Sequence, residues 1–211
     1  MQTVRIVFEK TGRARFISHL DLVRTMTRVV RRAGIPVWYT EGFNRHPYLT
    51  FAAPLSLGYE GLHETMDLRL TQPMDFGAMT AALDGAMPEG LRAISAAEAV
   101  CRPGELAAAC YRLTFDCPRA EIEALLAQPA IFVEKTSKKK VVRQIDIRPS
   151  FAGAALSGND TGTVMTVTLP CSSSETVNPG LFLTALNVGG GSRHCRVLRL
   201  ELLTAQGTPF R

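Results

Sequence analysis

The chain of 211 residues is 46% hydrophobic and 20% charged, which excludes global disorder and permits a packed core. No apolar run approaches the roughly 18 residues needed to cross a bilayer, and the amino-terminal stretch alternates in hydrophobicity, unlike a secretory signal. We therefore expect a cytoplasmic protein that has no membrane as a partner.

The net charge of +5 is spread unevenly along the chain. Residues 1–50 carry nine Lys and Arg against three Asp and Glu, whereas residues 51–100 carry two against seven. This asymmetry is typical of a protein with a face that binds a polyanion. An ordinary solvated surface explains it equally well, so charge alone does not decide between the two.

The first half of the chain alternates strand and helix signals. Residues 3–9 alternate as a strand, and Ser18 followed by Asp21 is a capping-box-like start of a helix that ends before Gly34 and Pro36. Further segments are predicted as extended at 35–40, 49–57 and 64–70, as helical at 75–87 and as a strand at 91–96. With one extended segment counted as an insertion, the order is β-α-β-β-α-β, the ferredoxin-like pattern.

The second half repeats this order after a linker at 102–104. The predicted elements are a strand at 111–115, a helix at 118–127, strands at 131–134, 141–147 and 163–169, a short helix at 178–186 and a strand at 197–203. We therefore predict an α+β fold of two ferredoxin-like (βαββαβ) halves packed together, residues 1–101 and 108–211. The first half carries an inserted loop or strand.

Several motifs in the first fifty-eight residues resemble the signature of one bacterial family. Lys10, Gly12 and residues 15–22 follow K-x-G-x-x-R-F-[LI]-S-H-L-D-L, residues 31–37 follow R-R-A-G-[IL]-P-V, and residues 42–47 and 51–58 follow G-F-N-x-H-P and F-A-x-P-L-x-x-G. Residues 141–149, VVRQIDIRP, are similar to a further R-E-I-D-[IL]-R-P element. The chain thus resembles the radical SAM-linked family, domain of unknown function 2344.

This resemblance implies a partner more than an activity. In many members of the family, this domain is joined to, or encoded beside, a radical SAM and cobalamin-binding protein. This chain lacks the C-x-x-x-C-x-x-C motif that binds the iron–sulfur cluster, so it is not itself the radical SAM enzyme. The resemblance therefore implies an accessory protein that works with a separate radical SAM/B12-binding protein.

Basic residues around the first helix form the first candidate site. Arginine binds phosphate through two parallel hydrogen bonds, which suits a nucleic-acid backbone. The same side chains could cover a solvated helix face or dock on an acidic protein. The set comprises Lys10, Arg13, Arg15, Arg24, Arg28, Arg31, Arg32 and Arg45.

Two histidines form the second candidate site. His19, His46 and Asp21, with Asn44 nearby, could serve as general acid and base in phosphodiester cleavage if they converge. They could also hold a metal, contact a phosphate or base, or make only structural hydrogen bonds. Nothing in the sequence shows that His19 and His46 meet.

Other segments carry weaker signals. The lysine-rich tip at 135–140, which includes Lys138, Lys139 and Lys140, suits a phosphate clamp or a solubility device. The glycine run at 189–191 lacks P-loop spacing and is interpreted as a turn. Trp38 and Tyr39 could stack on a base, although at least one of them should be core. The five cysteines include no C-x-x-C pair, so we expect reduced, structural thiols.

The leading hypothesis is a non-catalytic RNA-binding accessory protein that needs no cofactor and no metal. If its basic surfaces neutralise about five phosphates of a single strand, raising salt from 50 to 200 mM should weaken binding roughly a hundredfold. One alternative is a metal-independent endoribonuclease that uses His19 and His46. The other is a protein–protein adaptor that binds no nucleic acid.

Overall fold

The computed structural model describes residues 1–136, 142–159, 161–188 and 191–211, and its elements confirm the predicted α+β class. The chain divides into two compact units. Unit 1 comprises Met1–Leu106 and Arg199–Arg211, and unit 2 comprises Ala107–Leu198. The last residues thus group with unit 1, whereas the predicted division assigned 108–211 to one half. None of the helices in the described ranges is long and apolar enough to span a bilayer.

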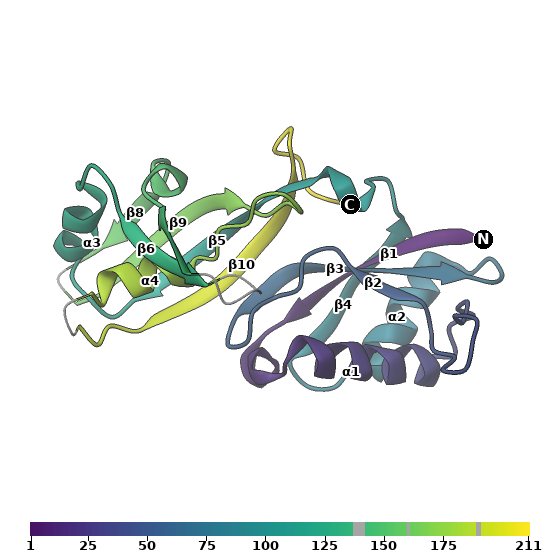
Figure 1. The fold of residues 1–211 in the computed structure, drawn as a ribbon. Helices are drawn as coiled ribbons and strands as arrows, with labels where there is room; N and C mark the ends of the chain where they lie inside the picture. Colours follow the sequence, from purple (N-terminus) through teal and green to yellow (C-terminus); the bar gives the residue numbers. More distant parts are fainter. Residues whose placement is uncertain (137–141, 160, 189–190) are drawn as a thin grey trace. The chain divides into compact units, whose positions relative to one another are not determined.

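Unit 1 is an antiparallel sheet with two helices (Figure 1). The sheet order is β4-β1-β3, β2 pairs with β3, and the part of β10 that belongs to this unit also borders β3. In chain order the elements are β1 (Gln2–Lys10), the 3-10 turn η1 (Gly12–Phe16), α1 (His19–Arg32), β2 (Leu49–Phe51), β3 (Glu60–Leu70), α2 (Phe76–Ala86), β4 (Leu91–Glu98) and η2 (Pro103–Glu105).

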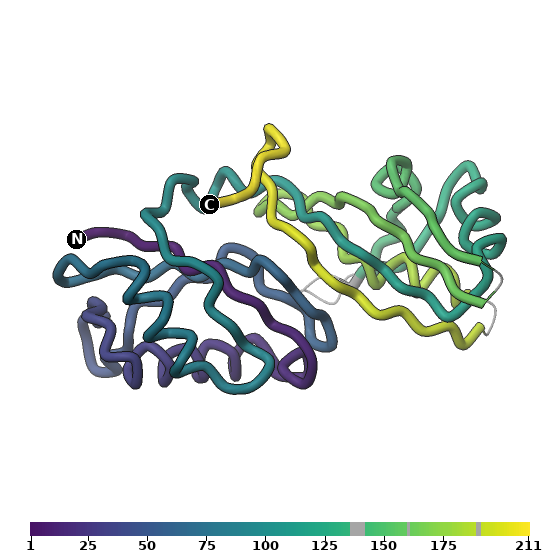
Figure 2. Tube along the Cα trace, turned by 180° about the vertical axis from the view of Figure 1, so that it is seen from behind, coloured from purple at the N-terminus to yellow at the C-terminus, as the bar shows by residue number. Residues whose placement is uncertain are grey.

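The core of unit 1 lies between one face of its sheet and the two helices. Alternate residues of β1 and β3 point to the same face, and those on the buried face pack with Met26 of α1 and Leu83 of α2. Both views show α1 running along one side of the strands (Figures 1 and 2). The strand residues of this core are Val4, Ile6, Phe8, Met66, Leu68 and Leu70.

Helix α1 begins and ends where its sequence signals predict. The Ser18 hydroxyl accepts a hydrogen bond from the backbone N–H of Asp21, which satisfies one of the free amides of the first turn. After Ala33, the helix is followed by Gly34 with φ of 65°, a left-handed conformation that favours glycine. Local capping chemistry therefore fixes both ends of the helix.

The segment between α1 and β2 differs from its prediction. Residues 35–40 form no regular strand, and only isolated bridges join Val37 to Leu70 and Tyr39 to Pro47. Prolines at 36 and 47 have no N–H to donate to a ladder, which keeps the pairing short. The extended segment predicted at 49–57 is a strand only over β2, because Pro54 follows soon after.

Unit 2 has its own sheet and a separate hairpin. The sheet order is β10-β5-β9-β8, in which β9 pairs antiparallel with β5 and β8, while β6 and β7 form a separate two-stranded sheet. The strand β8 was not predicted. The elements are β5 (Leu106–Phe115), α3 (Arg119–Leu126), β6 (Phe132–Thr136), β7 (Val142–Asp146), η3 (Pro149–Phe151), β8 (Ala155–Gly158), β9 (Thr163–Pro170), α4 (Gly180–Leu186) and β10 (Cys195–Thr204).

Candidate functional site

The turn that precedes α1 is built on buried charges. Lys10 is 1% exposed, and its Nζ donates to the carbonyl oxygens of Arg15 at 3.3 Å and Tyr59 at 3.5 Å. The backbone N–H of Gly12 donates to Oε1 of the buried Glu60 at 2.8 Å. Burial lowers the pKa of the Lys10 ammonium. The prediction that Lys10 is a surface contact for RNA is therefore corrected: its ammonium holds the turn together from inside.

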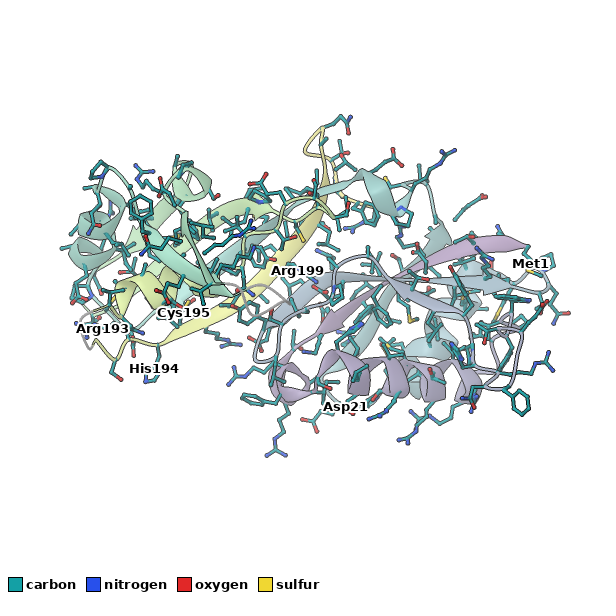
Figure 3. The ribbon with its side chains drawn as sticks, in the orientation of Figure 1. Met1, Asp21, Arg193, His194, Cys195 and Arg199 are labelled. Atoms are coloured by element: carbon teal, nitrogen blue, oxygen red, sulfur yellow. The ribbon has the colours of Figure 1, made fainter. Side chains whose placement is uncertain are left out.

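Two buried ion pairs continue this network within unit 1. Glu64 accepts two hydrogen bonds from Arg199, one of them from Nε at 2.8 Å, and the guanidinium also donates to the Ala53 carbonyl at 2.6 Å. Arg199 is 2% exposed and Glu64 4% exposed (Figure 3 labels Arg199). Similarly, Arg5 donates to both carboxylate oxygens of Asp67, at 2.7 and 2.8 Å. These acids from the 51–100 stretch thus neutralise interior arginines.

Asp21 lies in the first turn of α1, beside the capping residue Ser18. Its carboxylate accepts hydrogen bonds from the Ser18 hydroxyl at 2.7 Å and from Arg24 at 3.0 Å. The Ser18 hydrogen bond, followed by that from Arg24, lowers the pKa of the Asp21 carboxyl. Asp21 is therefore ionised at neutral pH and engaged within α1, on the side that faces away from the sheet (Figure 3). This arrangement suits a structural role and gives no support to a general acid.

His19 and His46 have different surroundings. The His19 ring, on the first residue of α1, meets the Phe51 ring edge-on at 5.3 Å, and its buried Nδ1 makes no hydrogen bond to any described residue. The exposed His46 has its Nδ1 2.9 Å from the carbonyl oxygen of Asn44 and 3.2 Å from Oγ1 of Thr40.

The two histidines lie towards opposite ends of α1. Arg31, in the last turn of the helix, contacts Tyr39, which directly precedes the loop that holds His46. A helix of this length spans about 20 Å. No contact joins the two rings in the part of the chain that the structure describes. The structure therefore does not bring them together, and the endoribonuclease hypothesis lacks the geometry that it requires.

Four arginines of α1 lie on its exposed face, and we call them the α1 arginine stripe. Their spacing of three, four, seven and eight residues places them along one side of the helix. Arg24 pairs with Asp21, and Arg32 donates to the Ala86 carbonyl. No described ion pair joins the stripe to an acid of the 51–100 stretch. The stripe comprises Arg24, Arg28, Arg31 and Arg32.

The other predicted basic residues are more scattered. Arg13 and Arg15 lie in η1, and the Arg15 guanidinium covers the exposed ring of Phe16 at 4.6 Å. Arg45 is exposed in the loop that also holds Asn44 and His46. Lys138, Lys139 and Lys140 lie outside the described residues.

Sequence analysis did not predict an aromatic cluster in unit 1 that joins Trp38 to Tyr48 and Arg69. The Arg69 guanidinium lies 4.5 Å from the ring centroid of Tyr48 and 5.8 Å from that of Trp38, and the two rings are 5.7 Å apart. The alternation in β3 indicates which face Arg69 occupies, but not that Trp38 and Tyr48 come from another segment to meet it. We call these three residues the aromatic–arginine cluster.

The described residues contain no group of three or more His, Cys, Asp or Glu arranged to hold a metal ion. The cysteines are all free thiols. Burial raises the pKa of Cys195 to about 12 and also raises that of Cys117 (Figure 3 labels Cys195). A thiol with a raised pKa is a weak nucleophile at neutral pH, because only the thiolate reacts.

We therefore expect Cys117 and Cys195 to resist alkylation in the folded protein. At about pH 7.5, iodoacetamide should modify them roughly a hundredfold more slowly than after unfolding in denaturant. Mass spectrometry of tryptic peptides measures the extent at each cysteine, and the half-buried Cys101 is an internal comparison. Rapid alkylation of Cys195 in the folded state would show that its surroundings are more open than the structure indicates.

The chain is thus an α+β protein whose first helix carries four exposed arginines. Residues 3–179 match the model of a family described as uncharacterised proteins conserved in bacteria (DUF2344), and the chain belongs to this family. No curated protein matches it. A crystal structure of an unknown protein from Galdieria sulphuraria covers 94% of this chain and 98% of its own, at 13% identity and a TM-score of 0.28, too low to indicate a shared fold.

Proposed function

We propose that this protein is a non-catalytic RNA-binding accessory protein that acts in the cytoplasm. The observation that carries the proposal is the α1 arginine stripe, which presents four guanidinium groups on one exposed helix face. Only Asp21, at one end, offsets their charge through an ion pair among the described residues. Phosphate contacts from Arg supply most of the sequence-independent affinity for nucleic acid.

The proposed partner is a separate radical SAM/B12-binding protein. The motifs over residues 10–58 and 141–149 support it, because the family resemblance that they carry implies such a partner. We propose that the accessory protein presents the RNA, while the partner carries out the chemistry. Its own residues would then bind and orient the RNA and catalyse nothing.

We further propose that both units have ferredoxin-like topology. The order β4-β1-β3-β2 in unit 1 and the order β10-β5-β9-β8 in unit 2 support this assignment, with the β6–β7 hairpin as an insertion in the second. With that hairpin set aside, the elements of each unit follow one another along the chain as β-α-β-β-α-β. In this topology the helices cover one face of each sheet.

An adaptor that binds only protein is the second candidate function. Three apolar side chains near the start of α1 are exposed, namely Phe16 at 64%, Leu20 at 68% and Leu57 at 63%. The Gly58 N–H donates to the Arg15 carbonyl at 2.8 Å, which ties the loop of Leu57 to the turn of Phe16. Exposed apolar groups of this kind are typical of protein contacts. They fit docking of the partner enzyme as well as a pure adaptor.

Salt-dependent binding tests the RNA proposal. With about four phosphates neutralised by the stripe, the affinity for single-stranded RNA should fall roughly fiftyfold between 50 and 200 mM salt. Electrophoretic mobility shift with bulk cellular RNA, followed by fluorescence anisotropy with a defined oligonucleotide, measures this dependence. Absent binding at 50 mM salt, or binding that salt does not weaken, rejects the proposal and leaves the adaptor as the better hypothesis.

A further inference from the structure

The aromatic–arginine cluster lies on the face of the unit 1 sheet that the helices do not cover. Trp38 follows Val37, Tyr48 precedes Leu49, and Arg69 lies between Leu68 and Leu70. All four of these neighbours pack in or against the core beneath the helices. Because successive side chains of an extended chain point to opposite faces, Trp38, Tyr48 and Arg69 all point away from that core.

Backbone hydrogen bonds hold the cluster in place. The Trp38 N–H donates to the Arg69 carbonyl at 2.8 Å, and the Tyr48 N–H donates to the Trp38 carbonyl at 3.0 Å. The two rings are tilted by 58° at a centroid distance of 5.7 Å. All three residues are half-buried, so each is packed on one side and accessible on another. The rings are therefore positioned before any ligand arrives.

The chemistry of the cluster fits a planar, negatively charged ligand. Indole and phenol rings stack on nucleobases of any sequence, and an Arg guanidinium both stacks on a base and pairs with a phosphate. A cationic ligand fits poorly, because the Arg69 guanidinium already lies over both rings. The adjoining loop carries a fully exposed aromatic ring, Phe43, and an exposed cation, Arg45. Glu41 is the acidic residue of this loop.

We propose that the aromatic–arginine cluster binds an unpaired base of single-stranded RNA. This inference rests on the proposed function and gives that function a ligand class. The bases of an A-form duplex are stacked within the helix and cannot reach a protein ring, whereas unpaired bases can. Tyr39, next to Trp38, lies under Arg31 of the α1 arginine stripe at 5.7 Å. A strand could thus pass from the stripe around the sheet edge to the cluster.

The fluorescence of Trp38 tests this inference directly, because the chain has one tryptophan. Titration with a single-stranded oligoadenylate of about twelve nucleotides should quench the emission, and a duplex of the same length should not. Anisotropy with the labelled oligonucleotide gives the affinity of variants. Trp38→Ala should weaken single-strand binding about five- to hundredfold, and Trp38→Phe, which keeps a ring, should lose much less.

Controls separate this inference from the RNA proposal. Phe132→Ala removes a ring that is 63% exposed in unit 2 and should leave the affinity unchanged. Tyr48→Ala gives a second test if Trp38→Ala does not fold. RNA binding without quenching, with Trp38→Ala at wild-type affinity, or Tyr48→Ala at wild-type affinity where Trp38→Ala does not fold, would overturn the base-binding cluster and leave the RNA proposal standing. The absence of any RNA binding overturns both.

Discussion

Replacing Glu64 by glutamine should lower the free energy of unfolding by about 3–5 kcal/mol, because it removes the carboxylate charge that pairs with the buried Arg199 guanidinium. Arg199 is 2% exposed, so water cannot take over the role of the carboxylate. The Glu64 charge also favours the protonated form of the nearby Lys10 ammonium, which burial disfavours. Chemical denaturation with urea, followed by circular dichroism, measures the change.

Two further variants identify the cause. Glu123→Gln breaks the exposed ion pair between Arg119 and Glu123 and should cost at most about 1 kcal/mol. Adding Arg199→Met to Glu64→Gln removes the buried cation and should recover part of the lost stability. A loss below about 1 kcal/mol for Glu64→Gln would show that the pair is more hydrated than its burial indicates. If the double variant loses as much stability as Glu64→Gln alone, the loss is due to altered packing and not to charge.

The elements of unit 1 that were predicted correctly are those whose signals are local. Ser18 and Gly34 fix the ends of α1 through capping and backbone conformation, and both lie within or next to the helix. The alternation of Val4, Ile6 and Phe8 similarly indicates β1 and the face that it packs against the helices. Neither feature depends on a contact with a distant part of the chain.

The position of Lys10 could not be predicted in this way. A lysine in a basic, polar turn is normally solvent-exposed. Lys10 is buried because the carbonyl of Tyr59 and the acids Glu60 and Glu64 surround it, and those residues come from a distant part of the sequence. Lys10 and Gly12 both make contacts that hold the turn, and only the three-dimensional structure shows this role.

Strand pairing was the least predictable feature of unit 2. The segments of β6 and β7 were predicted as strands, but the sequence pattern does not show that they form a two-stranded sheet apart from the main one. The short β8, with the sequence ALSG, has little alternation and ends in glycine, so its sequence does not predict a strand. It is recognised as a strand from its pairing with β9. The aromatic–arginine cluster belongs to the same class of feature, because three separate segments form it.

The second large effect is expected on RNA affinity. Reversing two charges of the α1 arginine stripe, by Arg28→Glu with Arg31→Glu, should weaken single-stranded RNA binding about tenfold to a hundredfold in 0.1 M salt. Each lost phosphate contact should also reduce the salt slope by about 0.7. Arg28 and Arg31 are exposed and lie in no described ion pair, so the fold should tolerate the change. Anisotropy over a salt series measures both quantities.

A matched variant distinguishes a defined surface from net charge. Arg102→Glu with Arg112→Glu changes the net charge equally, and both of these arginines are exposed outside the stripe. A protein attracted to RNA by overall charge would lose the same affinity in either pair, because long-range attraction depends on the sum of charges. A protein that binds through α1 would lose affinity only in the first pair, since direct phosphate contacts act over a few ångströms. Equal losses would therefore remove the stripe as the binding surface, even if the wild-type protein binds RNA.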